Sequence, residues 1–275
     1  MTTVVAADLD RTLIYSSAAI EATLGPDAVP PLLCVEFLDD RPQSFLTAAA
    51  GRWLERLAGS AVLVPTTTRT LAQYDRVRLP GGPVRYAVTS NGGHIVVDGR
   101  SDAAWGRSTQ DRVALDGASL GEVVAELHRR AQAPWVRTLR VADELFCYLV
   151  VDLDGLPATF VPEWSRWCAV RNWVVSVQGR KIYALPRSLT KQAAVAEVLR
   201  RVGGDRLIAA GDGALDAGFL SLAGAAIRPR HGELHELGWT ADHVTITAES
   251  GVLAGEEIAH WLLAQAAAPE QGVVS

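Results

Sequence analysis

Four small or apolar residues run directly into two carboxylates in the stretch Val4-Val5-Ala6-Ala7-Asp8-Leu9-Asp10-Arg11-Thr12. A short, uninterrupted apolar run is typical of a strand that is covered on both faces, as in parallel sheets. Because side chains alternate along an extended chain, Asp8 and Asp10 point the same way. At about 4 Å and an effective dielectric of about 20, two such charges repel by roughly 4 kcal/mol. A divalent cation with oxygen ligands would offset this repulsion, whereas capping of a following helix by the two aspartates is the simpler alternative.

The composition narrows the class of protein. The chain has 275 residues, 49% hydrophobic and 21% charged, which suits one large globular domain or two unequal ones. The net charge of −5 argues against nucleic-acid binding, and no apolar run is long enough to predict a membrane segment. Cys34, Cys147 and Cys168 form no Cys-x-x-Cys motif. We therefore expect reduced thiols in a cytoplasmic protein, with no signal peptide before the first strand.

A second predicted strand also ends in polar residues. The apolar run 61–64 leads into Thr66-Thr67-Thr68-Arg69, where hydroxyl groups followed by a guanidinium can bind a phosphate. Threonine also caps helices well, so a helix N-cap is the alternative.

A third predicted strand, residues 206–210, leads into Gly211-Asp212-Gly213-Ala214-Leu215-Asp216. If a helix opens here, Asp212 and Asp216 share one of its faces. Lys191 lies in the first turn of another predicted helix, where a positive charge opposes the helix dipole unless an anion lies nearby.

The other elements fall into two patterns. Residues 32–38 and 85–89 are strand-like, Ser44 opens a predicted helix that ends at Gly59, and an Asn-Gly turn within residues 90–93 predicts a hairpin with residues 94–97. Helix–strand alternation resumes from Ser188, with strands near 225–227 and 243–247 and a last helix over 253–266. Between the hairpin and Ser188, the sequence predicts a helix over 120–131 and strands over 146–151, 172–177 and 182–185.

These patterns predict an α/β fold with a parallel sheet and an inserted α+β domain. The core is expected in residues 1–105 and 186–275, and the insertion in residues 106–185, with its tryptophans filling a small core. In an open α/β sheet, ligands bind at the carboxyl ends of the strands, so the polar clusters converge. Four carboxylates, a lysine and a hydroxyl-rich loop in one crevice are typical of a metal-assisted phosphoryl-transfer site.

The chain resembles the haloacid dehalogenase-like (HAD) superfamily of phosphatases, type IIB. The stretch from Asp8 to Thr12 matches its Asp-x-Asp-x-Thr motif, and Thr67 matches the Thr or Ser that follows the second strand. Lys191 matches the third motif, and Gly211-Asp212 with Asp216 matches the fourth. The resemblance implies a Rossmann-like core with a C2-type cap between the second and third motifs. Arg11 and Leu215 depart from the residues that are common at their positions.

The resemblance also implies roles for these residues. Asp8 is the nucleophile that forms an aspartyl-phosphate, and Asp10 is the general acid and base. Thr67, Thr68 and Lys191 bind the phosphate. Mg²⁺ is the implied cofactor, and its predicted ligand set is Asp8, Asp10, Asp212 and Asp216. Arg69, Asn91, Gly92 and Arg180 are the predicted substrate-binding residues.

The implied reaction is hydrolysis of a small phosphorylated metabolite, for which a sugar phosphate is expected. Arg137, Arg140, Arg180 and Lys181 of the cap could bind a second anionic group or be solvated strand edges. A phosphomutase and a non-catalytic phosphometabolite-binding protein are the alternatives. We reject a dinucleotide site at Gly211-x-Gly213, because Asp216 would face the pyrophosphate, and we interpret His231 and His235 as surface residues rather than zinc ligands. The segment from Tyr15 to Pro42 has no assigned role.

Overall fold

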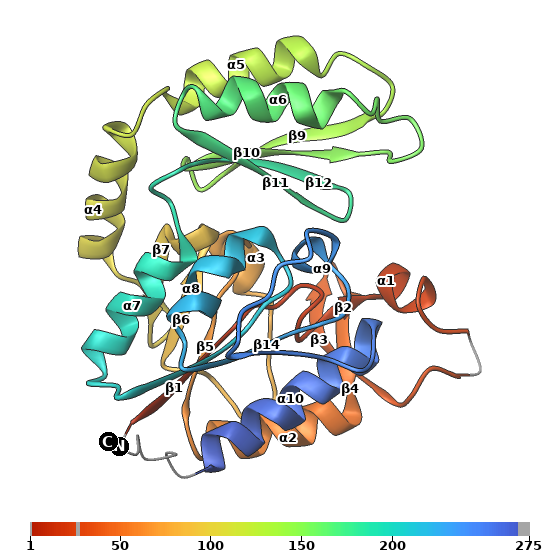
Figure 1. The fold of residues 1–275 in the computed structure, drawn as a ribbon, viewed down its shortest axis with the longest axis vertical. Coiled ribbons are helices and arrows are strands. Elements are labelled where there is room, and N and C mark those ends of the chain that lie inside the picture. Colours follow the sequence, from red (N-terminus) through yellow and green to blue (C-terminus); the bar gives the residue numbers. More distant parts are fainter. Residues whose placement is uncertain (1, 26–27, 269–275) are drawn as a thin grey trace.

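The computed structural model describes residues 2–25 and 28–268 and has a five-stranded parallel sheet at its centre (Figure 1). The strand order is β15-β14-β13-β1-β5, so β1 lies between β13 and β5. The strand bounds are β1 (Thr3–Ala7), β5 (Val62–Pro65), β13 (Arg206–Ala210), β14 (Ala225–Arg228) and β15 (Val244–Ile246). This order confirms the predicted parallel sheet. It brings together the carboxyl ends of the three strands that carry the polar motifs.

The alternation of side chains along β1 explains why its apolar run is uninterrupted. Val5 and Ala7 belong to one buried cluster, whereas Val4 and Ala6 belong to another on the opposite face of the sheet. All four residues are 0% exposed. Helices therefore cover the sheet on both sides, as the sequence predicted.

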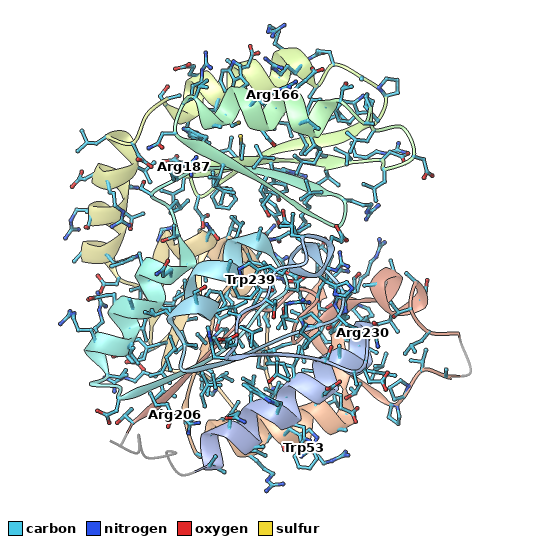
Figure 2. All side chains as sticks on the ribbon, viewed as in Figure 1. Trp53, Arg166, Arg187, Arg206, Arg230 and Trp239 are labelled. Carbon is cyan, nitrogen blue, oxygen red and sulfur yellow. The ribbon has the colours of Figure 1, made fainter. Side chains whose placement is uncertain are left out.

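Two pairs of helices form these covering layers (Figure 1). One face carries α2 (Ala48–Ala58) and α10 (Gly251–Ala267), and Trp53 of α2 packs against the ring of His260 of α10, with 4.9 Å between centroids (Figure 2). The other face carries α7 (Lys191–Arg201) and α8 (Ala217–Leu222). None of the helices in the described parts of the chain is long and apolar enough to cross a membrane.

A hairpin extends this core beyond β5. It comprises β6 (Tyr86–Thr89), β7 (His94–Val97) and the short β8 (Arg100–Ser101), and a bridge between Thr66 and Val88 joins it to the end of β5. The predicted Asn-Gly turn is confirmed as a tight turn, with Asn91 and Gly92 both at positive φ. Helices α3 (Leu71–Tyr74) and α4 (Ala103–Ala114) flank this hairpin in the sequence.

The segment that follows the first motif forms a small antiparallel sheet of its own. Its strands are β2 (Tyr15–Ser16), β3 (Leu32–Leu38) and β4 (Arg41–Thr47), and α1 (Ser17–Glu21) follows β2. The prediction that Ser44 opens a helix was wrong, because Ser44 to Thr47 pair with β3 and the helix begins only at Ala48, capped by the Thr47 hydroxyl. The strand pairing buries Leu46 and outweighs the local helical spacing.

The inserted region forms a four-stranded antiparallel sheet with two helices on its outer face (Figure 1). The elements are α5 (Leu120–Arg130), β9 (Val136–Ala142), β10 (Phe146–Val151), α6 (Phe160–Ala169), β11 (Trp173–Gln178) and β12 (Lys181–Pro186). Trp164 and Trp173 are fully buried between sheet and helices, as expected. The free face of the sheet is turned toward the core, as a cap would be; the exact domain boundaries stay a prediction.

We predict that Leu54→Ala lowers the free energy of unfolding by about 2–5 kcal/mol, because Leu54 of α2 is 0% exposed and its removal leaves a cavity against the sheet. The matched control is Leu115→Ala, where the leucine is 89% exposed and the change should stay within about 0.5 kcal/mol. Urea unfolding followed by tryptophan fluorescence measures both, and equal effects would contradict the assignment of this core.

Candidate active site

The centre of the site is a buried lysine between two carboxylates. Asp8 follows β1 and is 5% exposed, and Lys191 at the start of α7 is 1% exposed. The Lys191 Nζ donates to Asp8 Oδ1 and to Asp216 Oδ1, each at 2.6 Å. Burial alone lowers the pKa of Lys191, but the two carboxylates reverse this and raise it above its ordinary value. The anion that the sequence required beside Lys191 is thus supplied by the protein itself.

Asp216 also shapes the loop that carries Asp212. The loop follows β13 and forms a 3-10 turn over Ala214–Asp216. Asp216 Oδ2 accepts hydrogen bonds from the backbone N–H groups of Asp212, at 3.1 Å, and Gly213, at 2.9 Å. The Asp216 side chain fills the space above Gly211, where an added Cβ would lie 2.6 Å from it. The Asp216 carboxylate thus occupies this turn, which agrees with the rejection of a dinucleotide site there.

Three buried carboxylates face one lysine. Oxygen atoms of Asp8, Asp212 and Asp216 lie within 4.8 Å of one another, and Lys191 is the one buried cation beside them among the described residues. The next nearest cation, Arg11, is 3.9 Å from Asp212 and 36% exposed. Two negative charges are therefore not balanced by a buried partner, and the donor atoms are all oxygens. This set fits a hard divalent cation.

The titration of these groups reflects the same imbalance. Burial raises the pKa of Asp8 to about 7, although Lys191 acts in the opposite direction. Burial, together with the charges of Asp8 and Asp216, raises the pKa of Asp212 well above its ordinary value. Without a metal, Asp8 and Asp212 therefore bind a proton at a higher pH than an ordinary aspartate does.

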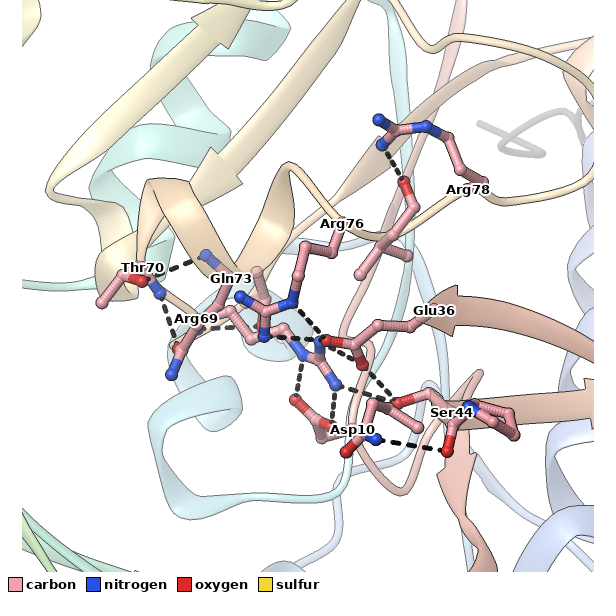
Figure 3. Close-up of polar contacts among 12 residues, drawn as sticks. Asp10, Glu36, Ser44, Arg69, Thr70, Gln73, Arg76 and Arg78 are labelled. Atoms are coloured by element: carbon pink, nitrogen blue, oxygen red, sulfur yellow. Dashed lines mark hydrogen bonds and ion pairs between the residues drawn. The ribbon is translucent and has the colours of Figure 1, made fainter. Parts of the chain in front are cut away.

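Asp10 faces a different environment, in contact with an arginine (Figure 3). The Arg69 Nε and Nη2 donate to Asp10 Oδ2 and Oδ1 at 2.7 and 2.8 Å, a two-pronged pair. Burial raises the pKa of Asp10, but the charge and hydrogen bonds of Arg69, together with the charges of Lys181 and Lys191, outweigh it and hold the pKa at about 2. Arg69 is predicted to contact the substrate, but two of its guanidinium nitrogens are already bound to the Asp10 carboxylate.

The remaining predicted residues divide between the site and its support. The Thr67 hydroxyl accepts from the backbone N–H of Arg69 at 3.1 Å, which leaves its own hydrogen to donate. The helix-cap alternative applies instead to Thr70, which caps α3. Asn91 donates through Nδ2 to the carbonyl of Leu189 at 2.7 Å, and a Cβ on Gly92 would clash with Thr190 at 2.2 Å. Asn91 and Gly92 thus fix the chain just before Lys191 and do not line the cleft.

A cleft of about 330 Å³ opens over Asp10 between the core, the small antiparallel sheet and the cap. Every side chain that lines it is polar or charged: Asp10, Arg11, Ser16, Glu36, Gln43, Ser44, Arg69, Gln73, Arg76, Gln178, Arg180, Lys181, Tyr183 and Asp212. Arg180 and Lys181 lie at the tip of the β11–β12 hairpin, whereas Arg137 pairs with Asp152 on the cap surface and Arg140 is exposed away from the cleft lining.

Two carboxylates, which the sequence analysis did not identify, join the cap to the core. Glu233 of α9 (Glu233–Glu236) accepts from the Ser176 hydroxyl at 2.7 Å and the Val177 N–H at 3.1 Å, both on cap strand β11. From the cap side, Asp143 accepts from the Leu71 N–H at 3.0 Å. Neither residue lies near a recognisable motif, so only the tertiary contact identifies them.

His231 was interpreted as a surface residue, and this was wrong. Its ring is half-buried: the backbone N–H of Gly251 donates to Nδ1 at 3.2 Å, so Nε2–H donates to the Arg11 carbonyl at 2.9 Å. His231 therefore supports the loop of the first motif. The three cysteines are free thiols, as expected, and the described residues contain no histidine cluster for zinc.

Comparisons with known proteins agree with this architecture. No family model and no curated protein sequence matches the chain. Among solved structures, the sucrose-phosphatase from Synechocystis matches with a TM-score of 0.64 at 13% identity, over 95% of this chain and 98% of that one. A HAD subclass IIB sugar phosphatase gives 0.56 at 13% identity, over 95% and 100%. The C-terminal domain of the C. albicans trehalose-6-phosphate phosphatase gives 0.59 at 11% identity, over 96% and 92%. The chain thus has the fold of the HAD phosphatases, as predicted.

We predict that the metal-free protein loses stability as the pH rises toward 7, and that Asp8→Asn removes part of this loss. The pKa of Asp8 is about 7 in the folded chain against an ordinary 3.8, so the folded state holds a proton that the unfolded state has released. The free energy of unfolding then falls as the pH rises from 3.8 to about 7, and it levels off at higher pH. Melting curves in EDTA at a series of pH values measure the effect, and parallel curves for the two proteins would contradict it.

Proposed function

We propose that this HAD-fold protein is a Mg²⁺-dependent phosphohydrolase that cleaves a small phosphorylated metabolite through an aspartyl-phosphate on Asp8. The observation that carries the proposal is the buried set of Asp8, Asp212, Asp216 and Lys191 beside a polar cleft. Its unbalanced negative charge needs a cation, and the cation with Lys191 makes the site attractive to a phosphate. The similar solved structures are sugar phosphatases, which supports the same reaction.

Asp8 and Asp212 are the carboxylates that would hold the metal, since Asp8 Oδ2 and the Asp212 side chain lie in the buried acidic set. The resemblance to the HAD phosphatases adds the backbone carbonyl of Asp10 as a further ligand. Both oxygens of Asp216 already accept N–H bonds, so Asp216 acts through Lys191 and the 211–216 loop. When bound, Mg²⁺ neutralises charge between Asp8 and the phosphoryl oxygens. Lys191 has three donors and uses two, which leaves one for a phosphoryl oxygen.

In the first step, an Asp8 oxygen attacks the phosphorus, and the bond from phosphorus to the ester oxygen breaks. The leaving oxygen takes a proton from the Asp10 carboxyl group, and the Thr67 hydroxyl with Lys191 binds the phosphoryl oxygens. Asp10 must therefore be protonated at this stage. Arg69 favours its ionised form, so the arriving phosphate, a neighbouring negative charge, must raise the pKa of Asp10 and weaken the pair.

In the second step, water attacks the aspartyl-phosphate. The Asp10 carboxylate takes a proton from that water, the bond between phosphorus and the Asp8 oxygen breaks, and inorganic phosphate leaves. Here the ion pair with Arg69 favours the form of Asp10 that the step requires.

The cleft supports a polar substrate. None of its lining side chains is aliphatic, and a hydroxyl-rich sugar phosphate would satisfy the many donors and acceptors there. Arg180 and Lys181 line this cleft at the tip of a cap hairpin, which supports a role for both in binding the substrate.

We predict that Asp8→Asn keeps the fold and loses phosphate release, because the amide cannot act as the nucleophile. A panel of phosphorylated sugars, nucleotides and p-nitrophenyl phosphate, assayed with Mg²⁺, measures phosphate release for both proteins. Release by the wild type alone supports a phosphatase, and the best substrate tests the sugar-phosphate expectation. Turnover that survives in Asp8→Asn would refute the nucleophile, and isomerisation without release would identify a mutase.

We further predict that chelation stops turnover and that added Mg²⁺ restores it, because the buried carboxylates then lose the cation that makes them attractive to phosphate. Mg²⁺ should also raise the melting temperature, by an amount that corresponds to about 2.7 kcal/mol at one hundred times the dissociation constant. Asp212→Asn is the matched variant and should lose most of this shift. Full activity after thorough dialysis against EDTA would refute the metal requirement.

A further inference from the structure

The small sheet β2-β4-β3 has no part in the motifs, yet it delivers a buried carboxylate to the cleft. Glu36 of β3 is 3% exposed and lies where the pairing with β4 shifts register on both sides of it. In a regular strand, neighbours face opposite sides, but Val35 and Glu36 are both buried. A bulge of this kind re-aims a side chain, and here it turns Glu36 toward Arg69.

Glu36 is held by three donors (Figure 3). The Ser44 hydroxyl, from the facing strand β4, donates to Glu36 Oε2 at 2.6 Å, and Arg69 Nη1 lies 2.8 Å from the same oxygen. Arg76 donates through Nη2 to Oε1 at 3.0 Å. Burial raises the pKa of Glu36, but these hydrogen bonds and charges outweigh it and lower the pKa, so the group is an anion in the folded chain.

Arg69 connects this anion to Asp10. Its Nε and Nη2 bind Asp10, while Nη1 pairs with Glu36 and Nη2 also donates to Ser44 at 3.2 Å. All three nitrogens of the planar guanidinium are therefore engaged, and its side chain is only 10% exposed. Because the guanidinium is rigid, fixing one edge on Glu36 fixes the other edge, and with it the Asp10 carboxylate, which is itself 41% exposed.

We propose that Glu36 and Ser44 are positioning residues for Asp10 that act through Arg69, and that this is the role of the sheet β2-β4-β3. The inference rests on the proposed function, because it concerns proton transfer by Asp10 to the leaving group. Without Glu36, Arg69 keeps its charge but loses the anchor that sets its plane. Asp10 then spends less time aligned with the ester oxygen.

The test uses two esters that differ in their need for a proton on the leaving oxygen. Phenolate is a poor leaving group and depends on the acid, whereas p-nitrophenolate leaves with little protonation. For Glu36→Gln, we expect kcat/KM, which reports the first step alone, to fall by about tenfold or more on phenyl phosphate and by less than about threefold on p-nitrophenyl phosphate. The second step, in which Asp10 acts as the base, is common to both esters and does not enter kcat/KM. A purely structural role would lower both rates together.

Two further variants keep the test decisive. Ser44→Ala removes one hydrogen bond, leaves the charge of Glu36 in place, and should cause the same selective loss at about threefold on phenyl phosphate. If the Glu36→Gln protein does not fold, the Ser44→Ala protein is tested in its place. Glu197→Gln is the matched control, since Glu197 of α7 also binds two arginines, Arg200 and Arg201, but does not line the cleft. Both rates should stay at the wild-type level.

Each outcome has one meaning. A selective loss on phenyl phosphate in Glu36→Gln or Ser44→Ala supports the inference. Equal losses on both esters, or no loss in either variant, overturn it while the proposed function stands. If the wild-type protein with Mg²⁺ hydrolyses neither these esters nor the wider panel, the proposed function fails and the inference fails with it.

Discussion

Three buried carboxylates that share one lysine are the constraint on which the rest of this structure depends. Such a set is costly in a low-dielectric interior unless charge is supplied from elsewhere. The chain supplies part of it through Lys191, which reaches Asp8 and Asp216 at 2.6 Å each. A proton or a divalent cation must supply the remainder. In the proposed function, the same unfavourable charge that weakens the empty site favours a divalent cation there and, through the cation, a phosphate.

The cleft is assembled from parts of the chain that are remote in sequence. The core contributes Asp10 and Asp212, the small antiparallel sheet contributes Glu36, and the cap contributes Lys181. Ion pairs on Arg69 link the core to the small antiparallel sheet, because its two anions, Asp10 and Glu36, come from these different segments. The cap is itself fixed by single carboxylates such as Glu233, so a modest number of polar contacts sets the shape of the site.

Sequence reasoning succeeded where the pattern is local and failed where pairing is long-range. The apolar run before Asp8 predicted a doubly covered strand, and its residues do divide between two clusters on opposite faces of the sheet. By contrast, Ser44 was placed at the start of a helix. Its hydroxyl bonds Glu36 across a strand pair, and no local spacing signals such a contact. Glu36 was not predicted for the same reason, since a single glutamate in an apolar strand belongs to no recognisable motif.

The sequence by itself determined the parallel sheet and the identity of the residues that meet at its edge, because these follow from periodicity and from spacing along the chain. Only the tertiary structure decided which charges pair. It assigned Lys191 to Asp8 and Asp216, gave Arg69 to Asp10 and Glu36, and turned Asn91 away from the cleft. Those choices depend on distances of a few ångströms between segments far apart in sequence, and electrostatic energy changes steeply over that range.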